Sequence, residues 1–213
     1  MIYNKLITVL SSSRDNTIFW EKSQALSPAR DNVFKTYIFL FAIVFLQFNF
    51  ATAQIGKFNS YEGKFSIQFP GEVTEQAKEI ETTLGTMAYH TFYHNSTEED
   101  ATNFIYLVSY VDYPDGAIHS DSTELIEEFF QATLEESVLN MNGDLRYSDE
   151  IKLFDYPGRF WRIDYNEDSM VMKTKAFLVK NRYYSIQVGT LKELATNLDM
   201  DKFLESFNLL SSE

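Results

Sequence analysis

The sequence predicts an α+β fold built around an antiparallel sheet, on three observations. Apolar and polar residues alternate with a period of two over most of the chain after residue 54, which is typical of half-buried strands. One long stretch, Leu125–Met141, follows a helical period instead. Turns of three or four residues join the later strands, which indicates antiparallel neighbours rather than βαβ units.

The chain opens with a segment that we assign to export and exclude from the fold. Lys35 is followed by the apolar run Tyr37–Leu46 and then by Ala51-Thr52-Ala53, the three parts of a secretory signal peptide. Gln47 interrupts the run, which is too short for a stable membrane span. We therefore expect a signal peptide over residues 33–53, cleavage between Ala53 and Gln54, and a periplasmic or secreted bacterial protein that meets the membrane only transiently.

Two alternatives stay open for this segment. Residues 1–32 are polar and lack periodicity, so they are either a long N-terminal extension or an untranslated stretch before a start at Val33. The apolar run is either removed or kept as a signal anchor. The small side chains of Ala51 and Ala53 favour removal, which leaves residues 54–213 as a single domain.

The first strands of this domain show the alternation plainly. Phe65, Ile67 and Phe69 alternate with polar residues up to Pro70-Gly71, and a second strand is predicted over 84–93. The next strand, Phe104–Val111, is apolar on both faces, so we expect a central position with both faces covered.

A long helix follows. Asp121 is placed to cap it, and Asn142-Gly143 supplies a left-handed exit. Its predicted apolar face consists of Leu125, Ile126, Phe129, Phe130, Leu134, Val138 and Met141.

Four further strands and a last helix complete the chain. The strands are predicted at Leu145–Phe154, Arg159–Tyr165, Met170–Val179 and Tyr183–Val188, and the helix at Asp199–Phe207. Asp155-Tyr156-Pro157-Gly158, Asn166-Glu167-Asp168 and Lys180-Asn181-Arg182 are the turns between the strands.

Composition excludes several function classes. Residues 54–213 keep 13 of the 18 basic and 28 of the 31 acidic residues, a net charge of −15. Such a chain lacks the basic surface that phosphate contacts need, so we expect no nucleic acid partner. A cationic partner or an unidentified envelope protein fits better. The absence of cysteine excludes a lipoprotein anchor, thiol chemistry and cysteine-based metal sites.

The segment Tyr61–Pro70, with the sequence YEGKFSIQFP, resembles the opening strand of the PsbP-like proteins. Pro157-Gly158-Arg159, Arg182–Ile186 and Phe203–Phe207 follow in a similar order. That family includes an extrinsic subunit of photosystem II, a Ran-binding nuclear import factor and the DcrB-type envelope proteins. The resemblance implies a curved antiparallel sheet with helices on both faces, an α/β/α sandwich that supports a larger assembly without catalysis of its own.

The chain is rich in aromatic residues, with 19 Phe and 13 Tyr, and some of them supply the one candidate binding surface in the sequence. The ordinary interpretation is cross-strand packing. The alternative is an aromatic-lined groove for a partner peptide or an apolar ligand, with acidic side chains at its rim. The residues assigned to that surface are Tyr89, Tyr93, Tyr106, Tyr110 and Trp161.

Catalytic and metal motifs are not found. His90 and His94 share a strand face but lie roughly 13 Å apart at a strand's rise, too far for one ion. The acidic loops Glu98-Glu99-Asp100 and Asn166-Glu167-Asp168 lack the spacing of a calcium loop. No Gly-x-Ser-x-Gly or phosphate-binding glycine loop occurs. We assign no catalytic, cofactor-binding or metal-ligating residue.

Three functions remain. The first is a non-enzymatic interaction or assembly-support protein of the cell envelope. The second is a carrier for a small or lipid-like apolar ligand. The third is a carboxylate-based hydrolase. The sequence has many carboxylates but does not show which two would lie together in a cleft.

Overall fold

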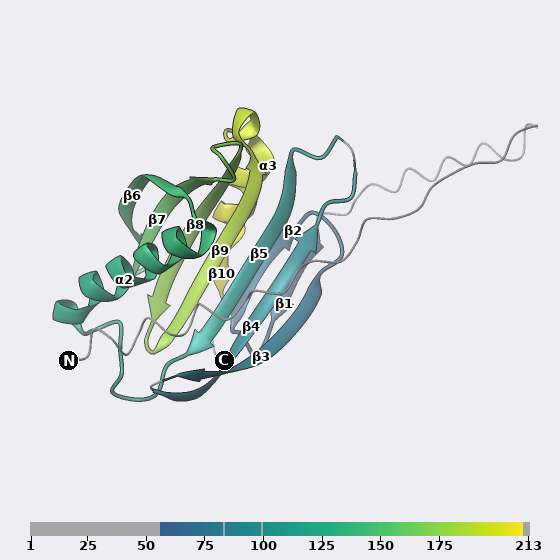
Figure 1. Ribbon diagram of the computed structural model, residues 1–213. Helices are drawn as coiled ribbons and strands as arrows, with labels where there is room; N and C mark the ends of the chain where they lie inside the picture. The colour runs from purple at the N-terminus through teal and green to yellow at the C-terminus, as the bar shows by residue number, and fades with distance from the viewer. Residues whose placement is uncertain (1–55, 83, 99, 211–213) are drawn as a thin grey trace, which may run out of the picture. The chain divides into compact units, whose positions relative to one another are not determined.

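The computed structural model describes residues 56–82, 84–98 and 100–210, and these form part of one compact unit. Seven antiparallel strands make the larger of two sheets, in the order β3-β4-β5-β9-β8-β7-β6 (Figure 1). Its strands are β3 (Thr74–Thr82), β4 (Gly85–Asn95), β5 (Asn103–Asp112), β6 (Asp144–Leu153), β7 (Tyr156–Tyr165), β8 (Met170–Val179) and β9 (Arg182–Leu191).

Strand β5 is internal to this sheet, as its two apolar faces predicted. Val108 and Tyr110 point to one face and Val111 to the other, and all three are buried. Both faces of the sheet are therefore covered along β5, each by a separate core.

The first core lies between the large sheet and a small one. The small sheet has the order β1-β2-β10 and consists of β1 (Gly56–Ser60), β2 (Phe65–Phe69) and β10 (Asn208–Leu209). Phe65, Ile67 and Phe69 are almost fully buried against Tyr110 and its neighbours. Helix α3 (Leu198–Ser206) adds Met200, Phe203 and Leu204 to the same core and contacts β2.

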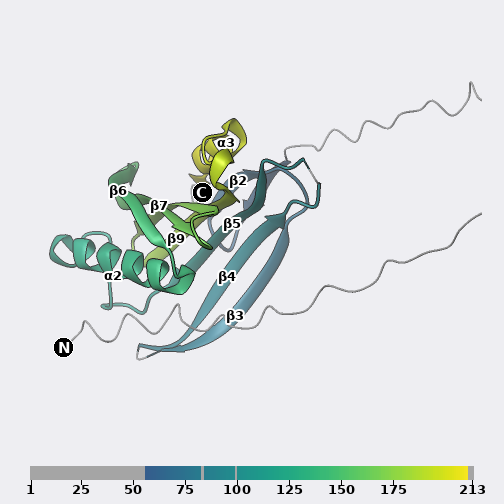
Figure 2. The ribbon, with the colours of Figure 1, turned by 45° about the horizontal axis from the view of Figure 1, so that its top comes forward.

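The second core lies under helix α2 (Thr123–Met141), which packs on the opposite face near β7 (Figure 2). Phe129, Phe130 and Leu134 are buried there against a layer that includes Trp161 and Ile163. The helix ends as predicted, because Asn142 is left-handed (φ 46°) and the Gly143 N–H donates to the Val138 carbonyl. Its start differs from the prediction: Ser122, not Asp121, is the N-cap residue, and the Ser122 side chain makes no capping hydrogen bond.

The predicted fold class is wrong. Among the described residues there are ten strands in two sheets and only two α-helices, so the protein is mostly β and is not an α/β/α sandwich with helices on both faces. One face carries α2, but the other is covered chiefly by the small sheet. The physical reason is that β2 supplies three large, almost fully buried apolar side chains to that core, so a strand of the small sheet shares with the short α3 the role that the prediction gave to helices.

The predictions for residues 1–32 and 33–53, and for the bond between Ala53 and Gln54, lie outside the described residues. Within the described ranges, no helix has the length and apolar character needed to span a membrane.

Candidate functional site

A pocket of about 440 Å³ lies between α2 and the hairpin of β6 and β7. Ten residues line it: Thr123, Ile126, Glu127, Phe130, Glu150, Ile151, Lys152, Pro157, Gly158 and Arg159. Its volume falls within the range of about 300–1,000 Å³ that is typical of small-molecule sites.

Regular spacing in both elements builds this pocket. Thr123, Ile126, Glu127 and Phe130 are three, four and seven residues apart, so they occupy one stripe of α2. The other wall is three successive cross-strand pairs, in which Glu150, Ile151 and Lys152 oppose Arg159, Gly158 and Pro157. The helical stripe and the end of the hairpin therefore face each other over the same stretch.

Arg159 is the unusual residue of this pocket. It lies on β7 in phase with Trp161 and Ile163, so strand alternation turns its side chain toward the buried face under α2. Its side chain is only 10% exposed. Burial of a guanidinium is costly unless the charge is paired and its donors are satisfied.

The pairing of Arg159 is incomplete. Its Nη2 donates to Oε2 of Glu127 on α2. Oε1 of Glu150 on β6 is 3.9 Å from the same nitrogen, too far for a hydrogen bond. The buried Nε–H has no partner among the described residues. One edge of the guanidinium is thus only half used.

Polar and apolar groups are combined in the pocket. Ile126 and Pro157 supply apolar surface over the buried Phe130, and the charged lining residues are Lys152 and Arg159 with Glu127 and Glu150. An arrangement of this kind suits a ligand with a charged group and an apolar body.

A second cluster lies on the opposite face of the large sheet. The Tyr110 ring lies against the His90 imidazole, 4.5 Å between ring centroids and 6° between planes. The guanidinium of Arg182 is also 4.5 Å from the centre of the Tyr110 ring. Because β5 lies between β4 and β9, Tyr110 is held between these two groups.

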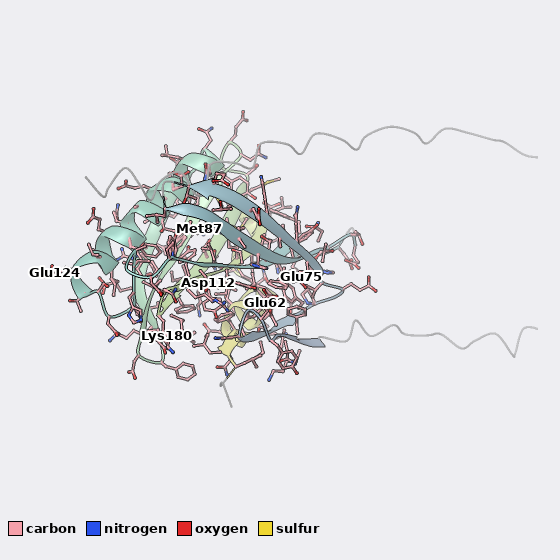
Figure 3. All side chains as sticks on the ribbon, turned by 90° about the horizontal axis from the view of Figure 1, so that it is seen from below. Glu62, Glu75, Met87, Asp112, Glu124 and Lys180 are labelled. Atoms are coloured by element: carbon pink, nitrogen blue, oxygen red, sulfur yellow. The ribbon has the colours of Figure 1, made fainter. Side chains whose placement is uncertain are left out.

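Acidic side chains surround this stack. Arg182 donates to both carboxylate oxygens of Asp112, each at 2.6 Å. Burial raises the pKa of Tyr110 to about 12, and the charges of Glu62, Asp112 and Glu75 contribute to the rise against that of Arg182. Figure 3 shows these three carboxylates at the end of the unit that is seen from below. The Tyr110 hydroxyl and His90 Nδ1 are buried without partners in the described part of the chain.

The five aromatic residues assigned to a binding surface are distributed over both faces. Tyr89, Tyr93 and Trp161 are on the α2 side, and the Tyr89 hydroxyl lies 2.7 Å from Ser109 Oγ. Tyr106 and Tyr110 belong to the core under the small sheet. Trp161, Tyr106 and Tyr110 are buried, so the five residues do not line a common groove.

The candidate metal ligands have other partners. Nδ1 of His94 lies 2.9 Å from the Glu72 carbonyl, and Nδ1 of His119 accepts a hydrogen bond from the Asp121 N–H at 3.3 Å. Asp168 in the 166–168 turn pairs with Arg146 and Lys192, whose hydrogen bonds lower the pKa of its carboxyl. Within residues 56–82, 84–98 and 100–210, no group of three His, Asp or Glu side chains is placed to hold a metal ion.

Sequence reasoning missed Arg159 as a site residue, although a signal for it was present. The residue was read only as the start of a strand after Pro157-Gly158. The alternation through Trp161 and Ile163 places an arginine on the face that those apolar residues occupy. A cation in phase with a buried apolar stripe needs a partner from the covering element, which here is Glu127.

Neither the known protein-family models nor the curated proteins give a match to this chain. The function is therefore argued from the geometry of the pocket.

Proposed function

We propose that the protein is a non-enzymatic binding protein of the cell envelope, and that the pocket between α2 and the β6–β7 hairpin holds a small ligand. The observation that carries this proposal is the pocket itself, a cavity of ligand size in which a buried arginine has an unused donor. Export rests on the signal-like segment at residues 33–53, which precedes the described residues.

Binding is favoured over catalysis by the way the charges are arranged. Glu127, on α2, reaches across the pocket and is bound to the Arg159 guanidinium, and Glu150 lies beside Arg159 on the neighbouring strand. A carboxylate that is already bonded to a buried arginine arranges charge for the recognition of a ligand.

A blocking substitution tests this proposal. Ile126→Trp places an indole in the pocket from α2, whereas Leu139→Trp adds the same side chain at a position of that helix that is 73% exposed. The protein is produced from the full chain in its native cells, and native mass spectrometry measures any bound small molecule. We expect a retained ligand in the wild type and in Leu139→Trp, and its loss in Ile126→Trp. Absence of a ligand from all three proteins, or its retention in Ile126→Trp, would contradict the proposal.

A second function, interaction with a cationic partner, is favoured by the acidic group of Glu62, Glu75 and Asp112 beside Tyr110. This surface lies on the other face of the sheet from the pocket. Replacement of Glu62 and Glu75 by Gln should weaken capture of a cationic envelope protein and leave the small ligand in place. Unchanged capture by this double variant would argue against the second function.

A further inference from the structure

We infer that the pocket recognises a carboxylate attached to an apolar body, and that this carboxylate binds Arg159 by displacing Glu127. The inference rests on the proposed function and deepens it, because it names the chemical class of the ligand. Glu127 then acts as an internal competitor that occupies the guanidinium when the ligand is absent.

One edge of the Arg159 guanidinium is only half used. Nε and Nη2 lie on the same side of a guanidinium, and their two N–H groups match the two oxygens of one carboxylate. Glu127 accepts a hydrogen bond from Nη2, while the Nε–H is buried and has no partner among the described residues. A carboxylate that approached this edge squarely would satisfy both donors.

The two partners of the ion pair differ in their exposure to water. The Glu127 side chain is 63% exposed, and that of Arg159 is 10% exposed. An ion pair with one partner largely in water is weak, because water competes for the exposed carboxylate. Glu127 can therefore turn into solvent by rotating its side chain, while Arg159 stays fixed on β7.

The net charge of the pocket lining changes when Glu127 has turned away from Arg159. Arg159 and Lys152 then face the pocket with only Glu150 to balance them. The pocket becomes net positive within a strongly acidic protein, and it selects an anion.

The apolar residues explain why an external carboxylate can replace one that is already attached to the protein. The half-buried Ile126 and Pro157 offer apolar surface in the pocket, with the buried Phe130 behind them. A ligand with an apolar body gains burial there in addition to the ion pair. Two sources supply such a group: a free monocarboxylic acid and the C-terminus of a peptide that ends in an apolar residue.

Isothermal titration calorimetry on protein made from the full chain tests this inference with four probes. Octanoate and 1-octanol share an alkyl chain and differ in the carboxylate. The tetrapeptide Gly-Gly-Val-Leu is used with a free and with an amidated C-terminus. We expect binding of octanoate, of the free peptide or of both, and binding at least about tenfold weaker for the neutral counterparts. Octanoate alone would identify a free acid as the source, and the free peptide alone a chain end.

Two substitutions then separate recognition from structure. Arg159→Lys keeps the positive charge but removes the two parallel N–H donors of the guanidinium, and it should weaken carboxylate binding at least about tenfold. Glu127→Gln removes the competitor and should strengthen binding about two- to fivefold. Glu128→Gln makes the same charge change at an exposed neighbour that does not line the pocket, and should leave affinity unchanged.

Equal binding of octanoate and 1-octanol, or weaker binding by Glu127→Gln, would overturn the inference. So would a lack of binding by both carboxylate probes. If native mass spectrometry still finds a ligand that Ile126→Trp excludes, the pocket is a binding site for a different chemical class. The proposed function then stands while the carboxylate assignment falls.

Discussion

The packing of α2 on the sheet leads to a quantitative prediction for Phe129→Ala. Phe129 is 2% exposed and lies in the core under the helix. Its ring makes edge-to-face contacts with Tyr113, Phe130 and Tyr183, at centroid distances of 5.6, 5.4 and 5.6 Å. Two of these neighbours are outside the helix, so the substitution removes contacts that join α2 to the rest of the unit.

The expected loss in the free energy of unfolding is near the upper end of the range for Phe→Ala changes in protein cores. Phe→Ala changes in protein cores cost about 3–5 kcal/mol, which includes the cavity left behind. Each aromatic pair adds about 0.5–1.5 kcal/mol beyond area burial. Tyr183 is fixed in β9 and pairs with β5 and β8, which limits collapse around the cavity. We therefore expect a loss of about 4–5 kcal/mol in the free energy of unfolding.

Urea unfolding measures this loss directly. With a slope of about 2 kcal/mol per molar urea, the midpoint should fall by about 2 M at unchanged slope. Leu139→Ala removes a large apolar side chain from the same helix at a position that is 73% exposed, and should change stability by less than about 0.5 kcal/mol. Effects of similar size at the two positions would refute the described packing of α2.

Three further predictions concern a carboxylate, a helix end and processing. The ion pairs of Asp168 lower the pKa of its carboxyl. The stability that Asp168 contributes is therefore present above the ordinary Asp pKa of about 3.9, and it is lost as the pH falls through the lowered pKa. Thermal unfolding should thus show Asp168→Asn less stable than the wild type at pH 7 and equally stable in strong acid. Asn142→Ala should cost about 1 kcal/mol in urea unfolding and Asn142→Gly should not, since only Ala is strained at φ 46°. Intact-mass analysis of the exported protein should give Gln54 as its first residue, and a membrane-bound form that keeps Phe39–Phe50 would contradict this.

Strands with strong alternation could be predicted, and those without it could not. Met170–Val179 has its predicted bounds, and the strands around Phe65 and Phe104 begin and end within one or two residues of prediction. Strand β3 was missed because its side chains are mostly polar and exposed, so its pairing with β4 is the main feature that makes it a strand. Strand β1 has Phe58 as its one large apolar residue and β10 has two residues, so neither shows a period. These omissions hid the small sheet and caused the wrong fold class.

The site could be predicted only in part. The spacing that puts Ile126 and Phe130 on one stripe of α2 is visible in the sequence, and so is the phase of Arg159 with Trp161. The register that sets Glu150 opposite Arg159, and the position of α2 over the hairpin, are tertiary facts. A pocket needs both walls, so neither periodicity alone could reveal it.

The burial of Arg159 gives a last test of whether this residue serves binding or the fold. Arg159→Met removes the buried partner of the ion pair and leaves Glu127, which is 63% exposed and can be solvated by water, so no unpaired charge stays buried. The Arg159 Nε–H is buried without a partner among the described residues, so the ion pair offsets only part of the free energy that burial of the guanidinium costs. Arg159→Met should therefore leave the urea midpoint unchanged or raise it, and it should also abolish octanoate binding. A variant that lost stability by about 3 kcal/mol or more would show that the pair with Glu127 holds α2 on the sheet, and the carboxylate site would lose its main support.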